Sequence, residues 1–436
     1  MITPADEVRL NLRPIITCPH CWEHFPPENS LWVAQHPELV EDPRLGDDAQ
    51  HRFMPDRFDV HGNALDSREV VCKDLACPQC HLIIPRALFE MQPFYISVIG
   101  APACGKSYFL SSMTYRSRTV FPQSFQISFA DSDPVCNEIL NAYEELQFFN
   151  PERGKLVKLP KTEEAGHLYH YVNMGDFTVT YPKPFFFSLR PSDSHPSAGE
   201  FTRAVSRVLV IYDNAGESFL PGRDSATNQV ARHIAESQAL LYLYDPTQDP
   251  RFRADCAQVS EDPQVHTSTV TARQELIFHE VASRLRKHAS LDQHAKCDRP
   301  IIVTVTKYDV WAPLLKPLLN NAELMDPFQA TDIEEMFALH VPYVEHVSKQ
   351  LRKLLLKYSP ELVKSVESFS NDVLFVPVSA TGVSPSVEND SGALGMRPGD
   401  IKPFWVEIPL LYAFAKWSKG IIPEVVVGEG NMNMPG

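Results

Sequence analysis

Nearly continuous runs of apolar residues recur along the chain after residue 92, and each run ends at a glycine or a polar side chain. Strands of a parallel sheet are buried on both faces, so they show such unbroken apolar runs instead of strict alternation. We therefore expect five buried strands, within residues 94–99, 207–213, 238–245, 300–306 and 371–379.

The segments between these runs carry apolar residues at the three- and four-residue spacing of an amphipathic helix. Helices are expected within residues 108–117, 133–149, 226–236, 265–291, 336–358 and 404–419. Further strands are expected at 167–172, 177–181 and 185–189, whereas 250–263 and 314–333 show no regular period. Strands that alternate with helices predict an α/β fold with a mainly parallel sheet.

The first region, residues 1–91, carries two Cys-x-x-Cys pairs. Each pair puts two thiolates on one tight turn, and two such turns supply the Cys₄ set that a structural Zn²⁺ prefers. About 55 residues separate the pairs, so the intervening segment 30–68 is expected to be a loop-rich insert. The expected ligands of one shared zinc are Cys18, Cys21, Cys77 and Cys80. The alternatives are a redox pair, two separate sites, or ligands drawn from His20, His24, His81 and Cys72.

The run at 94–99 leads directly into Gly-x-x-x-x-Gly-Lys-Ser and then into a helical segment. Strand, glycine loop and helix are the context of a phosphate-binding loop, whose backbone N–H groups and helix N-terminus surround a phosphate. Lys106 would reach the β- and γ-phosphates, and the Ser107 hydroxyl would bind Mg²⁺. The expected nucleotide-binding residues are Gly100, Ala101, Pro102, Ala103, Cys104, Gly105, Lys106, Ser107 and the adjacent Tyr108.

Three later strand ends carry patterns of the same kind. The run at 207–213 ends in Asp213-x-x-Gly216, a pattern in which Asp holds Mg²⁺ through water and the Gly N–H senses the γ-phosphate. The run at 300–306 ends in Thr-Lys-x-Asp. This pattern selects guanine, because the Asp carboxylate accepts hydrogen bonds from N1 and from the exocyclic N2 of the base. These residues are Thr306, Lys307 and Asp309, and after the last strand Ser379 and Ala380 resemble a final guanine-contact loop.

These four motifs follow one another in a fixed order, each after an apolar strand. In this the chain resembles the Ras-like, translation-factor class of phosphate-loop GTPases, over about residues 92–420. The Asp-x-x-Gly-Glu form, the long inserts and the zinc knuckles are most similar to bacterial double-GTPase proteins. The resemblance implies a three-layer phosphate-loop GTPase fold, bound GTP or GDP with Mg²⁺, and a place in a prokaryotic multi-protein conflict or defence system. It implies catalytic roles for Lys106, Ser107, Gly216 and Glu217.

The chain departs from the Ras pattern at two points. Ras-type hydrolysis uses a Gln after Asp-x-x-Gly to orient the attacking water, and here that residue is Glu217. The negative charge of a carboxylate is unfavourable beside the γ-phosphate. We therefore expect slow, partner-regulated hydrolysis of GTP. No threonine stands out for the first switch, for which the candidates are Thr162, Thr178, Thr180 and Thr202. Candidates for an arginine finger within the chain are Arg203, Arg207 and Arg223, although a partner often supplies this group.

The net charge of −15 disfavours general binding of nucleic acid or anionic membrane. No apolar run reaches the ~20 residues that span a bilayer and no signal peptide is evident, so we expect a cytoplasmic protein with protein regulators or effectors. The expected organisation is a zinc-binding module at 1–91, a GTPase domain at 92–420 and a disordered tail at 421–436. The alternatives are a phosphate-loop ATPase with Asp213 or Asp245 as its acid, and a zinc-bearing scaffold without turnover.

Overall fold

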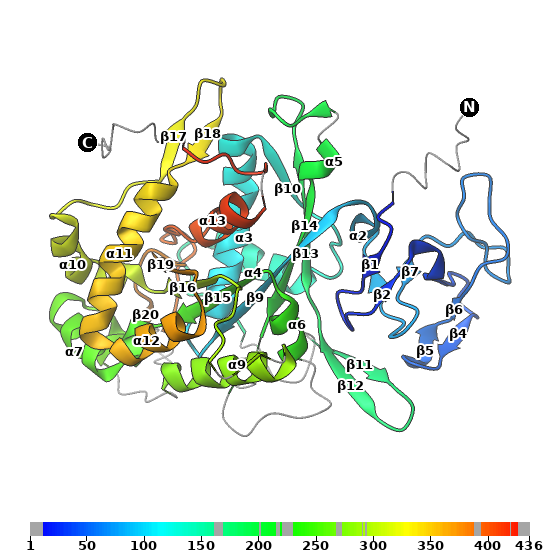
Figure 1. Cartoon of the computed structure of the whole chain (residues 1–436), viewed down its shortest axis with the longest axis horizontal. Helices are drawn as coiled ribbons and strands as arrows, with labels where there is room; N and C mark the ends of the chain where they lie inside the picture. The colour runs from blue at the N-terminus through cyan, green and yellow to red at the C-terminus, as the bar shows by residue number, and fades with distance from the viewer. Residues whose placement is uncertain are drawn as a thin grey trace.

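The computed structural model describes residues 12–160, 169–199, 202–214, 219, 230–266, 273–289, 291–292, 294–387, 394–418 and 420–425. The chain has a mixed α/β architecture, with a smaller N-terminal module beside a larger body that is built on one sheet (Figure 1). Among the described residues, no helix is long and apolar enough to span a membrane.

Seven strands form the central sheet and confirm that it is mostly parallel. In spatial order they are β10 (Ile127–Asp131), β13 (Phe185–Pro191), β14 (Arg207–Asp213), β9 (Gln92–Gly100), β15 (Ala239–Tyr244), β16 (Ile301–Val305) and β19 (Val373–Pro377). Strand β13 pairs antiparallel with both of its neighbours, and every other neighbouring pair is parallel. Each of the five predicted apolar runs therefore lies in the parallel part of the sheet.

Helices connect most of these strands. The longer ones are α3 (Lys106–Phe125), α4 (Glu138–Phe148), α6 (Val230–Glu236), α7 (Pro250–Val259), α9 (Gln274–His288), α10 (Tyr308–Leu315), α11 (Val341–Tyr358), α12 (Pro360–Phe369) and α13 (Ile408–Trp417). The short ones are α2 (Ala87–Glu90), α5 (Thr202–Val205) and α8 (Pro263–His266). Outside the sheet, β11 (Tyr169–Asn173) and β12 (Thr178–Pro182) form a separate hairpin.

The structure corrects several predicted elements. The polar segment after Pro250 forms helix α7, because the Asp249 side chain caps its first N–H groups and Phe252 and Cys256 are buried. The helix expected from residue 336 begins only at Val341, after a strand β18 (Phe337–Leu339) that pairs with β17 (Phe328–Ala330). The ordered domain extends past residue 420, since Ile421 and Ile422 are buried in the core.

The described part of the N-terminal module contains only short strands and loops, apart from a 3-10 turn and the short helix α2. A sheet in the order β6-β3-β7-β8 and two hairpins are made from β1 (Ile16–Thr17), β2 (His24–Phe25), β3 (Leu31–Val33), β4 (Val40–Asp42), β5 (Gly46–Gln50), β6 (Arg52–Phe53), β7 (Leu75–Ala76) and β8 (Ile83–Ile84). The segment 30–68 is mainly irregular, as expected, but it is pinned by Asp66. This buried carboxylate accepts backbone N–H groups of Gln35, His36, Arg68 and Val70 at 2.9–3.2 Å.

Helices lie on both faces of the central sheet, which gives three layers. On one face, Phe94 of β9 packs against Phe414 of α13 with 4.9 Å between ring centroids, and Phe121 of α3 packs against Phe414 at 6.0 Å. On the opposite face, Tyr242 of β15 packs edge-on against Phe278 of α9 at 5.3 Å.

The N-terminal module covers the rest of this second face, over β9, β14 and β13. Tyr95, Phe186 and Tyr212 project from these three strands into a buried cluster that also contains the four paired cysteines. The Trp22 ring lies 4.6 Å from that of Tyr95 and 5.9 Å from that of Tyr212. The Tyr212 hydroxyl donates to the Pro19 carbonyl at 2.5 Å. The module and this face of the sheet therefore share one buried cluster.

Replacing Tyr212 with Phe should destabilise the whole protein. The change leaves the buried Pro19 carbonyl without its donor from the sheet, which costs about 1–3 kcal/mol of unfolding free energy. Urea unfolding of Y212F against Y171F, a change at a half-exposed tyrosine of β11, measures the difference. Equal stability of the two variants would contradict the buried hydrogen bond.

Candidate functional site

The carboxyl ends of the parallel strands meet at one edge of the sheet. Strand β9 lies at the point where the chain order reverses, with β14 on one side and β15 on the other. In open α/β sheets, ligands bind in the crevice outside the carboxyl ends of strands at such a switch point. The predicted phosphate loop begins there, because Gly100 is the last residue of β9.

The backbone of this loop needs glycine at both ends. Gly105 caps α3 with a φ of 90°, and Ala103 also has a positive φ of 59°. A Cβ on Gly100 would lie 2.9 Å from the Leu243 carbonyl oxygen of the neighbouring strand. Helix α3 starts at Lys106, so its N-terminal N–H groups and the positive end of its dipole face the loop.

The Lys106 side chain folds back onto its own loop. It is buried, and its ammonium donates to the carbonyl oxygens of Gly100 at 3.2 Å and Ala101 at 3.1 Å. Neutral carbonyls are weaker partners for an ammonium group than a phosphate oxygen is. The ammonium is therefore held close to the loop by partners that an anion could replace.

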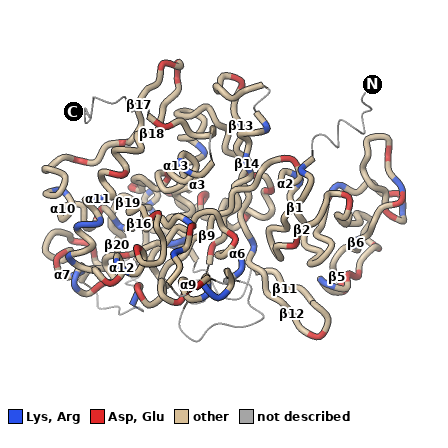
Figure 2. Tube along the Cα trace, in the orientation of Figure 1, with Lys and Arg blue, Asp and Glu red and all other residues tan. Residues whose placement is uncertain are grey.

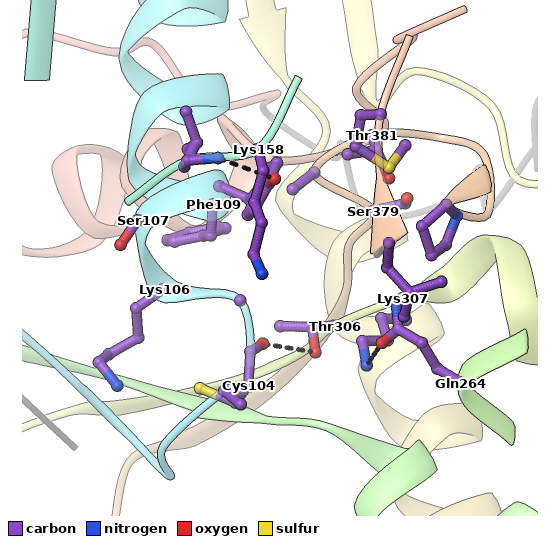
Figure 3. Close-up of a pocket in the computed structure, with 18 of the residues that line it drawn as sticks. Cys104, Lys106, Ser107, Phe109, Lys158, Gln264, Thr306, Lys307, Ser379 and Thr381 are labelled. Atoms are coloured by element: carbon purple, nitrogen blue, oxygen red, sulfur yellow. Dashed lines mark hydrogen bonds between the residues drawn. The ribbon is translucent and has the colours of Figure 1, made fainter. Parts of the chain in front are cut away.

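A cavity of about 430 Å³ opens over the loop (Figure 3), a volume typical of small-molecule sites. Three predicted motifs from distant parts of the sequence line it, through Pro102, Ala103, Cys104, Gly105, Lys106, Ser107, Tyr108, Thr306, Lys307, Asp309, Ser379 and Ala380. Gly100, Ala101 and Asp213 are not among its lining residues. Gly216 and Glu217 lie outside the described residues.

One end of the cavity is formed by Asp309 and Ser379. The Ser379 hydroxyl donates to the Asp309 carboxylate and accepts from the Gly382 N–H at 2.8 Å. Burial raises the pKa of Asp309, and the Ser379 hydrogen bond opposes this effect. Gly382 has a φ of 68°, and a Cβ there would lie 2.0 Å from the Lys402 carbonyl oxygen, so only glycine fits this turn.

Hydrogen bonds join the three motifs to one another. The Thr306 hydroxyl donates to the Cys104 carbonyl at 3.4 Å, which ties the segment after β16 to the phosphate loop. The Ser112 hydroxyl of α3 donates to the Ala380 carbonyl at 2.7 Å. The relative positions of the loop, the Thr-Lys-x-Asp segment and the Ser-Ala segment are therefore fixed without a ligand.

Lys307 occupies a left-handed backbone position, with a φ of 57°, just before α10. Its ammonium lies 2.7 Å from the buried Asp245 carboxylate and donates to Thr247 at 3.0 Å and Gln264 at 2.5 Å. Asp245 also accepts from the Thr247 N–H at 2.9 Å. Asp245 thus anchors Lys307 and caps a turn.

Asp213 ends β14 and is buried, in register with Val98 of β9. The next residue, Asn214, donates to the Val98 carbonyl at 3.1 Å, and its side-chain oxygen lies 2.7 Å from the His233 ring. His233 in turn stacks on Tyr212, with 4.6 Å between centroids. Asp213 therefore lies at the carboxyl end of the strand beside β9, one strand away from the predicted phosphate loop.

The predicted first-switch threonines and arginine fingers that lie within the described residues do not gather at the cavity. Thr178 and Thr180 lie on hairpin strand β12, and Thr202 and Arg203 lie on α5; none of them lines the cavity. Arg207 donates to the Ser418 hydroxyl at 2.9 Å, away from the loop. Thr162 and Arg223 lie outside the described residues.

Sequence reasoning missed several residues that line the cavity, among them Lys158, Asp262, Gln264 and Met396. They come from the segments after α4, after α7 and before α13, none of which carries a motif. Lys158 stands between two apolar residues in a long insert, and a single lysine in such a setting is too common to be singled out.

The four paired cysteines come together in the N-terminal module. Their sulfur atoms all lie within 4.8 Å of one another, with 3.7 Å from Cys18 to Cys80 and 3.5 Å from Cys21 to Cys77. A tetrahedral zinc with Zn–S bonds near 2.3 Å requires sulfur–sulfur distances of about 3.8 Å. The group can therefore bind a metal such as zinc. Burial raises the pKa of the Cys18 and Cys80 thiols, so a bound cation would have to favour their thiolates.

The alternative ligands named from the sequence are engaged elsewhere. Within the described residues, the four cysteines are the only metal-ligand cluster found. His20, His24, His81 and Cys72 instead contact Ile83, Thr17, Asp42 and Val70, respectively.

A search of protein-family models finds no match to the chain, and a search of curated proteins finds no significant relative.

Purified protein should contain about one zinc per chain, and C21S should lose it. A structural zinc contributes directly to folding, so metal loss should also lower the melting temperature by roughly 10 °C. Elemental analysis and thermal unfolding measure both effects. The matched control is C136S, because Cys136 is half-buried and outside the cluster. Unchanged zinc in C21S would show that the cluster does not hold the metal.

Proposed function

We propose that this protein binds guanine nucleotides with Mg²⁺ in the cavity over the phosphate loop and hydrolyses GTP slowly, as a partner-regulated switch. The observation that carries the proposal is convergence. Three segments far apart in the sequence, each following a parallel strand, line one cavity, and they are the segments with nucleotide-binding motifs.

The loop end of the cavity suits a chain of phosphates. The N–H groups at the start of α3 point toward the loop, and Lys106 is held beside it by carbonyl oxygens that a phosphate would displace. In the proposal, Lys106 moves onto the β- and γ-phosphates.

The Mg²⁺ ligands of the proposal are the Ser107 hydroxyl and, through water, the Asp213 carboxylate. Oxygen donors are what Mg²⁺ prefers. The register of β14 on β9 places Asp213 opposite Val98, two residues before Gly100 at the start of the loop. When bound, the ion would neutralise charge on the phosphate chain.

The other end of the cavity suits guanine. Asp309 is a partly buried carboxylate at the cavity wall, and a carboxylate accepts the paired N1 and N2 hydrogens that adenine lacks. Ser379 and Gly382 hold the carboxylate and its loop in place. The ion pair of Asp245 with Lys307 favours this proposal over an ATPase that uses Asp245 as its acid. A role in a prokaryotic multi-protein system stays a prediction from the resemblance.

The variant D309N should lose guanine preference. An amide cannot accept both base hydrogens, so GTP affinity should fall about 100-fold and xanthosine triphosphate should bind better than GTP. Calorimetric titration with GTP, ATP and xanthosine triphosphate, all with Mg²⁺, measures the change. The control is D326N, an exposed aspartate that does not line the cavity. Tighter binding of ATP than GTP by the wild-type protein would overturn the guanine assignment.

The variant E217Q should hydrolyse GTP about tenfold faster in single turnover. A neutral amide orients water without placing a negative charge beside the γ-phosphate. The K106A variant should bind GTP weakly and show no hydrolysis, which separates the protein's activity from a contaminant. If neither wild type nor E217Q turns over GTP with Mg²⁺, the protein is a nucleotide-binding scaffold rather than an enzyme.

A further inference from the structure

A short segment from the insert after α4 crosses the cavity beside the phosphate loop. We call residues 156–160 the strap. Val157 of the strap exchanges both backbone hydrogen bonds with Met396, each at 2.8 Å. Two residues on, the Leu159 N–H donates to the Tyr108 hydroxyl of α3 at 3.2 Å, and the Leu159 side chain is buried in the main core. The strap is thus fixed on both sides of Lys158.

The strap is pressed closely against the segment that holds it. A Cβ on Gly395 would lie 3.1 Å from the Val157 carbonyl oxygen and 3.2 Å from the Leu156 Cβ. Just before the strap, the Arg153 carbonyl accepts from the Gly399 N–H at 2.9 Å. These contacts define the strap's position independently of any ligand.

Lys158 extends from the strap into the cavity, toward the phosphate loop (Figure 3). No hydrogen bond or ion pair joins its side chain to the described residues. The other two lysines of the cavity are engaged, Lys307 by Asp245 and Lys106 by the loop carbonyls. Lys158 is therefore an exposed cation at the cavity, on a backbone that is held at both neighbouring residues, and its ammonium group is available to a ligand.

We propose that Lys158 is a further nucleotide-binding residue, which contacts the phosphate chain from the side of the strap. This inference rests on the proposed function and specifies a contact that the motifs do not provide. A phosphate oxygen forms a strong, charge-assisted hydrogen bond with an ammonium group. The strap is hydrogen-bonded to Tyr108 in the first turn of α3, so Lys158 can approach phosphates from beside the loop and the helix.

The test compares ligands that share a base and differ in phosphates. K158Q should bind GDP about tenfold more weakly than wild type, while guanosine binds both proteins equally. K158R should keep most of the GDP affinity, because it retains the positive charge. The matched control is K155Q, since Lys155 lies three residues earlier, is exposed and pairs with Glu152. Calorimetric titration of wild type, K158Q, K158R and K155Q with GDP and with guanosine measures these affinities.

The outcomes separate this inference from the proposed function. GDP binding by K158Q that equals that of K155Q would overturn the role of Lys158 while leaving guanine binding intact. An equal loss of affinity for GDP and for guanosine in K158Q would also overturn the role of Lys158, because that result indicates damage to the cavity. If the wild-type protein binds adenine instead of guanine nucleotides, the proposed base is wrong. In that case, a tenfold lower affinity of K158Q for ADP with unchanged affinity for adenosine would still support a phosphate contact by Lys158.

Discussion

Strands β13, β14 and β9 must be covered on both faces, and the rest of the structure depends on how this is done. Their side chains alternate between two apolar environments, so neither face can be left to water. Helices α3 and α13 cover one face, but over these three strands the second face belongs to the N-terminal module. Burying a large aromatic side chain such as Tyr95, Phe186 or Tyr212 contributes about 1.5–3 kcal/mol each.

The N-terminal module in turn depends on the sheet to bury its apolar side chains. Most of its strands are two or three residues long, and so small a unit has difficulty burying enough apolar surface by itself. Two devices compensate for this. The four cysteines can fix both knuckles on one metal, and Trp22 packs its ring on Tyr95 and Tyr212 of the sheet. A metal bound by the cysteines would therefore stabilise the same cluster that the sheet helps to bury.

Strand β14 connects the candidate metal centre with the proposed Mg²⁺ ligand. The Tyr212 hydroxyl donates to the carbonyl of Pro19, which lies between Cys18 and Cys21 in the first Cys-x-x-Cys turn. The next residue, Asp213, is the proposed Mg²⁺ ligand. Since successive residues of a strand point to opposite faces, Tyr212 faces the module and Asp213 the helical side. Asn214 and His233 continue the contact chain on the module side of the strand end. The position of Asp213 is thus set partly by the module.

Much of the sheet and of the cavity could be predicted from the sequence, because both depend on local signals. Parallel strands appear as apolar runs, and motifs at their carboxyl ends must meet at one edge. Helix α7 escaped prediction because its boundary depends on the Asp249 cap and only Phe252 and Cys256 are buried.

The strap shows a different limit. Its course depends on the pairing of Val157 with Met396, and no periodicity within the insert specifies a partner so distant in sequence. Lys158 has no motif around it, and the same lysine on an unpaired loop would be one more solvated surface charge. What distinguishes it is a backbone held at Val157 and at Leu159, which aims one ammonium group at the loop. Sequence patterns identify a residue's type and local element, whereas a binding role of this kind arises only from long-range pairing.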